Sequence, residues 1–252
     1  MTQNSTRTFD RIMRIRQERG AGHFVLIDPD KKPVEHLVNV ARACEQQGVD
    51  GLLIGGSLLF STAFDRFVQE IKKSVSIPVI LFPGNGRQIS GHADAILFMT
   101  LISGRNPQFL IGEHVHSAPV IRALQLESIP TGYMLIESGR PTTAEFMSST
   151  RPIPRTKPQI AVAHALAGEM LGLKMIYLEA GSGAEKPVPD DMIKKVTQVI
   201  DIPVVAGGGI RDPDTAAEKV KAGASFIVTG TLFEETENLA RLGEFASAIH
   251  LR

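Results

Sequence analysis

The sequence predicts one α/β domain built as a (β/α)8 barrel, because eight short apolar segments alternate with helical patterns and glycines follow several strand ends. The first apolar segments are continuous rather than alternating, which is typical of strands buried on both faces of a parallel sheet. A length of 252 residues is ordinary for one such barrel. We therefore predict a single TIM-barrel domain over residues 1–252, in which 1–20 form a polar, partly helical extension.

The expected strands are short apolar runs, and most of them end in a glycine or a polar residue. They are His23–Ile27, Gly51–Ile54, Pro78–Phe82, Ala95–Met99, Ile129–Glu137, Lys174–Leu178, Val204–Ala206 and Phe226–Thr229. The expected helices carry apolar residues at helical spacing. They are Thr8–Glu18, Val34–Gln47, Ala63–Lys73, Pro107–Gln125, Gln159–Gly172, Pro189–Ile200, one that starts at Pro213, and Leu232–Ile249. The first of these helices is expected to close the bottom of the barrel.

Two connections depart from the regular alternation. Residues 83–94 are rich in glycine and short for a crossover helix, so the third helix of the outer ring is expected to be missing or reduced. The segment Ser138–Lys157 is long, polar and rich in proline. A loop of that length in a compact barrel is usually functional, and we expect it to be mobile or to act as a lid.

Composition excludes several classes of partner. Lys plus Arg equals Asp plus Glu, 27 each, so no overall field attracts nucleic acid or an anionic membrane. Cys44 is the only cysteine, which excludes an intrachain disulfide and favours a buried packing role. Residues 1–20 lack the apolar core of a secretory signal, and no stretch approaches the length of a membrane span. The expected location is the cytoplasm.

Glycines after the seventh and eighth strands predict a phosphate site. Val204–Ala206 runs into three glycines, Gly207 to Gly209, before a helix start at Asp212, and Phe226–Thr229 ends in Gly230 and Thr231. Glycines let backbone N–H groups approach an anion, and a helix N-terminus favours negative charge. This pair of positions is where (β/α)8 barrels bind phosphate. The alternative for each glycine run is a tight turn.

Asp28 and Ser57 form a candidate Mg²⁺ site. Asp28 follows the first strand and Ser57 follows the second, which makes them neighbours at the barrel mouth. One carboxylate and one hydroxyl suit Mg²⁺, which keeps waters and completes its shell with phosphate oxygens. Asp28 could instead be a cap or turn residue ahead of Pro29, and Asp30 could be the ligand in its place.

Tyr177 and Glu179 form a candidate acid–base pair. They alternate with Leu178 at the end of the sixth strand, so their side chains point to the same side. In the barrel interior they could hold a small hydroxylated phosphate ester and take a proton from it. The segment Gly181–Gly183 follows with further backbone donors. The alternative is a surface glutamate at a strand end.

A zinc site at His114 and His116 is weakly supported, because two residues apart on a helix do not share a face. Solvated or interface histidines fit better.

The order and spacing of six segments resemble a known family, the geranylgeranylglyceryl phosphate synthases, including the related bacterial heptaprenylglyceryl phosphate synthases. The resemblance runs from about His23 to Glu235. The segments are Leu26–Lys31, Leu53–Ser57, Phe82–Asn85, Tyr177–Gly183, Ala206–Ile210 and Gly230–Thr231. Some family members carry Asn where Thr231 stands, which keeps a backbone donor but changes the side-chain contact.

The resemblance implies a prenyltransferase of ether-lipid synthesis. The 3-hydroxyl of sn-glycerol 1-phosphate would attack C1 of a prenyl diphosphate, with geranylgeranyl diphosphate the first guess and a longer donor the second. Asp28 and Ser57 would hold Mg²⁺ against the diphosphate, and Glu179 would deprotonate the hydroxyl. The implied glycerol-phosphate site comprises Tyr177, Leu178, Glu179, Ala180, Gly181, Ser182, Gly183, Gly208, Gly209, Gly230 and Thr231.

The prenyl chain would need an apolar groove. Candidates are the inward residues of Ala95–Met99 and Ile129–Ile136, together with Ile102 and the proline-rich loop. The family also implies a homo-oligomer, a dimer or a hexamer, for which the helix Pro107–Gln125 is a plausible contact surface.

Two alternatives stay open. Another phosphate-binding barrel enzyme, such as a sugar-phosphate isomerase or an aldolase, would keep the glycine loops but should place a lysine or a second acid at a strand end, and none is convincing. A barrel that binds phosphorylated lipids or metabolites without turnover would show no dependence on Mg²⁺.

Overall fold

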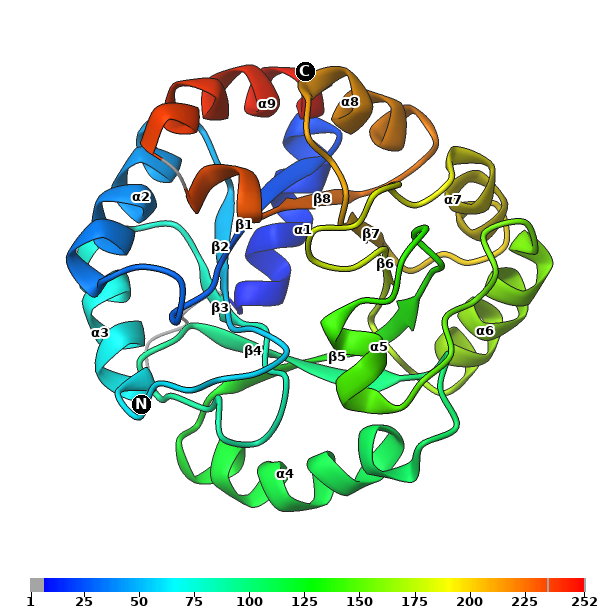
Figure 1. Cartoon of the computed structure of the whole chain (residues 1–252), viewed down its shortest axis with the longest axis horizontal. Helices are drawn as coiled ribbons and strands as arrows, with labels where there is room; N and C mark the ends of the chain where they lie inside the picture. Colours follow the sequence, from blue (N-terminus) through cyan, green and yellow to red (C-terminus); the bar gives the residue numbers. More distant parts are fainter. Residues whose placement is uncertain (1–6, 235, 252) are drawn as a thin grey trace.

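The computed structural model describes residues 7–234 and 236–251 and contains a closed barrel of parallel strands, β1 to β8, in chain order (Figure 1). The strands are β1 Gly22–Ile27, β2 Gly51–Ile54, β3 Val79–Leu81, β4 Ala95–Leu101, β5 Glu127–Leu135, β6 Met175–Glu179, β7 Val204–Gly207 and β8 Phe226–Thr229. β8 pairs with β1 and closes the ring. The predicted (β/α)8 architecture is confirmed; residues 1–6 of the predicted extension, Glu235 and Arg252 lie outside the described residues.

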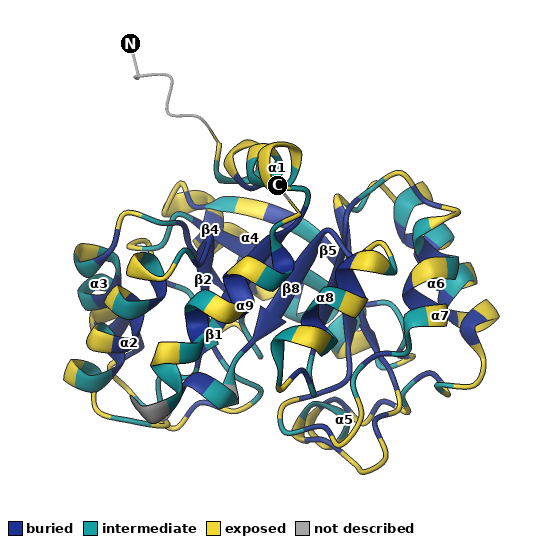
Figure 2. Ribbon diagram, turned by 90° about the horizontal axis from the view of Figure 1, so that it is seen from above, coloured by how far each residue is buried: buried dark blue, intermediate teal, exposed yellow. Residues whose placement is uncertain are grey.

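Helices surround the barrel and cover one of its ends (Figures 1 and 2). They are α1 Thr8–Arg19, α2 Val34–Gln46, α3 Phe64–Ser74, α4 Glu113–Ala123, α5 Thr143–Ser148, α6 Pro158–Met170, α7 Asp190–Thr197, α8 Pro213–Lys221 and α9 Leu242–Ile249. Ile12 of α1 is 1% exposed and packs with the barrel interior, as expected for a helix that closes the bottom. Figure 2 places α5 at the opposite end.

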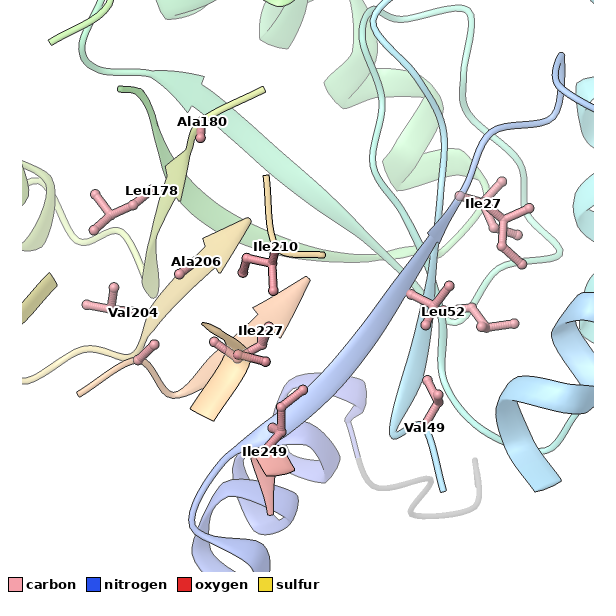
Figure 3. Packing of buried hydrophobic residues seen from close by; sticks show 14 of the residues in the cluster. Ile27, Val49, Leu52, Leu178, Ala180, Val204, Ala206, Ile210, Ile227 and Ile249 are labelled. Carbon is pink, nitrogen blue, oxygen red and sulfur yellow. The ribbon is translucent and has the colours of Figure 1, made fainter. Parts of the chain in front are cut away.

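Two apolar clusters form the core, one inside the barrel and one between the barrel and its helices. Along β1, Phe24 belongs to the inner cluster and Val25 to the outer one, because successive strand residues point to opposite faces. The outer cluster includes Ile27, Leu52, Leu178 and Ala180 (Figure 3). Cys44 is fully buried there, as predicted.

The third crossover contains no helix in residues 82–94, all of which the structure describes, so this prediction is confirmed. β3 pairs with β4 only through Ile80–Ala95 and Leu81–Ile96, whereas β4 pairs with β5 along its whole length. The part of β4 after Ile96 therefore has a strand neighbour, β5, on one side only.

Two segments differ from the sequence predictions. The proline-rich loop Ser138–Lys157 includes the short helix α5, whose first turn is capped by the Thr142 side chain accepting from the Glu145 N–H. The predicted helix Leu232–Ile249 is divided into the 3-10 helices η2 Thr231–Glu234 and η3 Thr236–Arg241 and the helix α9. Helical apolar spacing was present throughout, but it does not distinguish one long helix from a chain of short ones.

Helix α4 also begins differently from a regular helix, because the π-helical turn η1 Gln108–Gly112 precedes it. Within 7–234 and 236–251, no helix is both long and apolar enough to span a lipid bilayer.

Candidate active site

A polar cavity of about 670 Å³ lies where the strands end, and we call it the phosphate cavity. It gathers loops from β1, β2, β6, β7 and β8, as expected because all these loops open on the same face of the barrel. Most of the predicted site residues line it. They are Asp28, Ser57, Tyr177, Glu179, Gly181, Ser182, Gly183, Gly208, Gly209 and Gly230.

Two of the predicted residues, Leu178 and Ala180, do not contribute side chains to this cavity, and the side chain of a third, Thr231, is not described. Leu178 and Ala180 face the outer core instead, because they alternate with Tyr177 and Glu179 along β6 (Figure 3). The backbone N–H of Ala180 donates to Gly207 O at 3.0 Å. Thr231 begins η2, and its side chain lies outside the described part of the chain.

Glu179 is a carboxylate buried at the end of β6, with 6% of its surface exposed. Burial raises the pKa of its carboxyl to about 7, although a hydrogen bond from the Gly181 N–H to Oε1, at 2.6 Å, favours the charged form. A group with a pKa near neutrality is suited to accept a proton from a bound hydroxyl.

Tyr177 and Tyr133 pack beside Glu179. Their ring centroids are 5.4 Å apart, and burial, followed by the charge of Glu179, raises the pKa of both phenols. The Tyr177 hydroxyl is close enough to affect the pKa of Glu179, yet it has no partner in hydrogen-bonding geometry among the described residues. A buried hydroxyl without a partner is costly, which makes it a candidate donor to a ligand.

Asp28 and Ser57 lie at the β1 and β2 side of the phosphate cavity. A Cβ built on Gly56 would lie 3.2 Å from Asp28 Oδ2, so the carboxylate lies against the loop that carries Ser57. Burial raises the pKa of Asp28, which indicates that its negative charge is incompletely compensated. Asp30 binds elsewhere, since its two oxygens accept from Phe60 N at 2.6 Å and Ser61 N at 2.9 Å. Asp30, the alternative ligand considered for Mg²⁺, therefore holds the loop between β2 and α3.

The glycines after β7 adopt left-handed backbone conformations, with φ of 83° at Gly208 and 72° at Gly209. A Cβ on Gly208 would lie 2.6 Å from Glu179 Oε1, so only glycine fits between this strand end and the carboxylate. At the start of α8, Asp212 Oδ1 accepts from the Thr215 N–H at 2.7 Å, so one of the free N–H groups of this helix end is already capped. A phosphate here would depend on the glycine backbone.

Three cations that sequence reasoning did not select also line the phosphate cavity: Lys31, Arg140 and Arg211. The Arg211 guanidinium donates to Ala184 O at 2.6 Å, and Arg140 donates to Gly183 O. Both arginines thus hold the β6–α7 loop while contributing positive charge. A basic residue two positions after the glycine run was the available signal for Arg211.

A second cavity, of about 120 Å³, extends along β4 and α4, and we call it the apolar cavity. It is lined from both faces of β4, including Leu97 of the inner cluster and Ile96 of the outer one. This is possible because β3 pairs with β4 no further than Ile96. The two cavities share Gly56, Ser57, Phe82, Tyr133 and Ala144 in their linings.

The expected groove residues agree only partly with the apolar cavity. Residues of β4 and β5 line it, as do Ala144, Met147 and Ser148 of the proline-rich loop. Ile102 is not among the lining residues, since its side chain packs toward Gly132 and Gly168.

His114 is neither solvated nor at an exposed surface, which corrects its prediction. It is 8% exposed, lines the apolar cavity and shares a 3.1 Å hydrogen bond with Thr100 Oγ1. His116 is exposed. No group of three or more His, Cys, Asp or Glu side chains able to hold a metal is present among the described residues.

The chain matches a family model, described as the PcrB family, over residues 13–248. It is similar to the geranylgeranylglyceryl phosphate synthases of Chitinophaga pinensis, at 46% identity over 93% of each chain, and of Pyrococcus horikoshii, at 45% identity over 90% of this chain and 89% of the other. A solved structure of (S)-3-O-geranylgeranylglyceryl phosphate synthase from Thermoplasma acidophilum, in complex with its substrate sn-glycerol-1-phosphate, superimposes with a TM-score of 0.92. The two sequences are 34% identical, and the superposition covers 97% of this chain and 99% of the other.

Proposed function

Because this chain belongs to the PcrB family, we propose that it is a Mg²⁺-dependent prenyltransferase of ether-lipid synthesis. It joins the 3-hydroxyl of sn-glycerol 1-phosphate to C1 of a prenyl diphosphate, with geranylgeranyl diphosphate the first candidate donor. The observation that carries the proposal is the meeting of the phosphate cavity and the apolar cavity at Gly56 and Ser57. One cavity suits two phosphorylated groups, and the other suits a hydrocarbon chain.

Glycerol 1-phosphate binds in the phosphate cavity on the β6 to β8 side. The glycine backbones after β7 and β8 receive its phosphate, and Arg140 and Arg211 supply the opposite charge. The Thermoplasma acidophilum relative was solved with the same molecule as its substrate, which supports this assignment. The unpartnered Tyr177 hydroxyl donates to a glycerol oxygen, and Glu179 faces the hydroxyl that reacts.

In the reaction, Glu179 accepts the proton of the 3-hydroxyl as the oxygen forms its bond to C1 of the donor. The bond between C1 and the diphosphate oxygen breaks, and its electron pair leaves with the diphosphate. A carboxyl pKa of about 7 lets Glu179 accept this proton and later release it to solvent near neutral pH.

The diphosphate lies on the β1 to β2 side, near Asp28, Ser57 and Lys31. The donor set fits Mg²⁺, since it offers hard oxygens and an incompletely compensated carboxylate, while the substrate completes the shell. Mg²⁺ bound there would neutralise charge that develops on the leaving diphosphate. Lys31 contributes a further positive charge.

The apolar cavity receives the prenyl chain. Ser57, Phe82 and Tyr133 line both cavities, so the chain enters there, and Ile121, which lines the apolar cavity alone, is assigned to its far end. α4 follows β4 and runs back toward the bottom of the barrel, so residues late in α4 are the most distant from the diphosphate. The length of chain accepted therefore depends on side chains such as Ile121.

Exposed apolar side chains on two outer helices support self-association, as a dimer or a larger assembly. Ile111 of η1 and Val115 of α4 are 59% and 62% exposed, and Ile160 and Met170 are 40% and 83% exposed on α6. Exposed large apolar side chains are candidates for an interface when they gather into one patch. The cytoplasmic location expected from the sequence stays a prediction.

Label transfer tests the proposal. The purified protein is incubated with radiolabelled glycerol 1-phosphate, Mg²⁺ and prenyl diphosphates of increasing length, and the mixture is extracted with organic solvent. We expect label in the organic phase, with the best donor reporting the length of the apolar cavity. No transfer with any donor, despite measurable glycerol-phosphate binding, would favour a binding barrel without turnover.

A further inference from the structure

The Gly55–Ser57 loop, which follows β2 and carries the candidate ligand Ser57, is held by the side chain of Gln88. The Gly56 N–H donates to Gln88 Oε1 at 3.1 Å, and Gln88 Nε2 donates back to Gly56 O at 2.8 Å. The amide thus pairs with both polar groups of one residue, as a neighbouring strand would. Gln88 is completely buried, so water does not replace it.

Gln88 comes from the connection that lacks a helix. In this segment the chain turns at Asn85, whose carbonyl accepts from the Gln88 N–H at 3.1 Å, and the Gln88 side chain then enters the protein. Gln88 and Ser90 are 0% and 1% exposed, which is unusual for polar side chains on a short connection. A regular crossover helix would not bring this amide against the neighbouring loop in the same way.

On the side that faces Gln88, the Gly55–Ser57 loop is packed closely against its neighbours. Gly55 has a φ of 153°, and a Cβ there would collide with the backbone carbonyl of Phe82 and lie 2.9 Å from Gln88 Oε1. On the other side, Gly56 packs against the Asp28 carboxylate. Gln88 therefore fixes the separation between the loop and Asp28 from behind the site.

We propose that Gln88 is a positioning residue, which holds Ser57 in register with Asp28 so that the two can share Mg²⁺ and the diphosphate. The inference rests on the proposed function and concerns only its diphosphate side. Gln88 does not line the phosphate cavity, so it acts through the Gly55–Ser57 loop and not by contact with substrate.

The glycerol-phosphate side should be independent of Gln88. It is built from β6, β7 and β8, whereas the side-chain hydrogen bonds of Gln88 to the described residues all go to Gly56 in the β2 loop. Loss of the amide should then weaken binding of Mg²⁺ with diphosphate and leave glycerol-phosphate binding unchanged. A displacement of about 1 Å in a reacting group can cost as much as about 100-fold in rate.

The test uses the full-length Gln88→Met variant, which keeps the length of the side chain but removes both hydrogen-bonding groups. Gln88→Asn keeps the amide and shortens its reach by one methylene, and it serves if the methionine variant does not fold. Ser90→Ala is the matched control, because it removes a partly buried hydrogen bond in the same connection, from Ser90 Oγ to Asp65 Oδ1 at 2.7 Å, away from the site.

Calorimetry measures binding of inorganic diphosphate with Mg²⁺, and separately of glycerol 1-phosphate, to the wild type and each variant. For both Gln88 variants we expect the Kd for Mg²⁺-diphosphate, and the KM for the prenyl donor, to rise about 10- to 100-fold. The Kd for glycerol 1-phosphate should stay within twofold of wild type. Ser90→Ala should lower the Tm and change neither Kd.

Two results would overturn the inference: an unchanged Kd for Mg²⁺-diphosphate in the folded Gln88 variants, or an equal weakening in Ser90→Ala. The proposed function fails separately, if the wild type binds both ligands yet transfers no label. A wild type that binds no Mg²⁺-diphosphate would overturn both.

Discussion

The phosphate cavity and the apolar cavity adjoin at the barrel mouth but are built in opposite ways. The phosphate cavity lies mainly over β6, β7, β8, β1 and β2, where an α-helix follows each strand, after two 3-10 helices in the case of β8, and the candidate site residues lie at the strand ends. The apolar cavity lies over β3, β4 and β5, where one helix is absent and a π-helical turn precedes α4. Regular repeats thus position charged groups, and an interruption of the repeat provides space for a chain.

The difference teaches where each kind of site can arise in this fold. Backbone amides and strand-end carboxylates need the register of a closed barrel, because each must be placed against ligand atoms. A hydrocarbon chain needs only volume and apolar lining, which the incomplete pairing of β4 supplies. Ser57 and Tyr133 line both cavities, so they lie where the precisely placed polar groups adjoin the space for the chain.

Asp28→Asn should give the largest effect and should damage only the diphosphate side of the phosphate cavity. Removing the negative charge would weaken Mg²⁺ binding and slow transfer about 1,000-fold, the upper end of the range for loss of a group that acts on developing charge. Initial rates over a Mg²⁺ titration check this, with glycerol-phosphate binding expected to persist. Asp30→Asn is the matched control, because that carboxylate binds Phe60 N and Ser61 N instead. Equal activity with and without Mg²⁺ would remove the metal assignment.

Glu179→Gln should lower the rate by about 100-fold or more, because the amide does not accept the proton of the hydroxyl. The base must be ionised, so the wild-type rate should rise with pH through about 7, and the variant should lack that rise. Rates measured from pH 5 to 9 at saturating substrates compare the two. Wild-type kinetics in the variant would show that another group is the base.

Glu179→Gln, which lowers activity, should raise the stability of the protein above neutral pH. The carboxyl pKa is raised from 4.5 in the unfolded chain to about 7 in the folded protein, so wild-type stability falls as pH rises between these values. Above pH 7, the free energy of unfolding of Glu179→Gln should exceed that of the wild type by up to about 3 kcal/mol. Below pH 4.5 this difference should vanish. Denaturant titration at pH 4 and pH 8 measures it. A variant less stable at pH 8 would contradict burial as the cause of the raised pKa.

Ile121→Phe should affect the apolar cavity alone. The larger ring at the far end would lower kcat/KM for a geranylgeranyl donor about tenfold, as a change of pocket size typically does, while short donors keep their rates. Competition between donors of different length gives the ratio directly. Ile121→Leu conserves volume and should leave the ratio unchanged. A similar loss for every donor length would indicate that the chain lies elsewhere.

Tyr177→Phe should give the smallest effect. Loss of the unpartnered hydroxyl would raise the KM for glycerol 1-phosphate about 3- to 10-fold, the equivalent of one hydrogen bond. The Tm should stay level or rise slightly, since a buried hydroxyl without a partner is removed. Steady-state kinetics and thermal unfolding are measured together. A lower Tm with an unchanged KM would assign the hydroxyl a purely structural role.

The sequence predicted the phosphate cavity better than the apolar one for a physical reason. Gly208 and Gly230 follow directly after strands and Glu179 is the last residue of one, so their chemistry can be inferred from local sequence order alone. Leu178 and Ala180 were included with them and face the outer core, because a segment was assigned as a whole although strand side chains alternate. Closure of the barrel and the missing third helix were predictable from the strand count and the short 83–94 connection.

The apolar cavity left no comparable signal. Ile96 and Leu97 lie on opposite faces of β4 and both line it, but their residue types are those of any core strand. His114 is buried against the same cavity, where only tertiary packing distinguishes it from the exposed His116. The role of Gln88 was also out of reach, because its partner Gly56 lies on another loop.

A crystal structure with sn-glycerol 1-phosphate, Mg²⁺ and a non-transferable geranylgeranyl thiodiphosphate tests most directly whether the two cavities together form one prenyltransferase site. The account predicts phosphate on the glycine loops after β7 and β8, the metal between Asp28, Ser57 and the diphosphate, and the chain along β4 toward Ile121. The 3-hydroxyl should lie between Glu179 and C1 of the donor. A chain bound outside the apolar cavity, or a diphosphate away from Asp28, would contradict it.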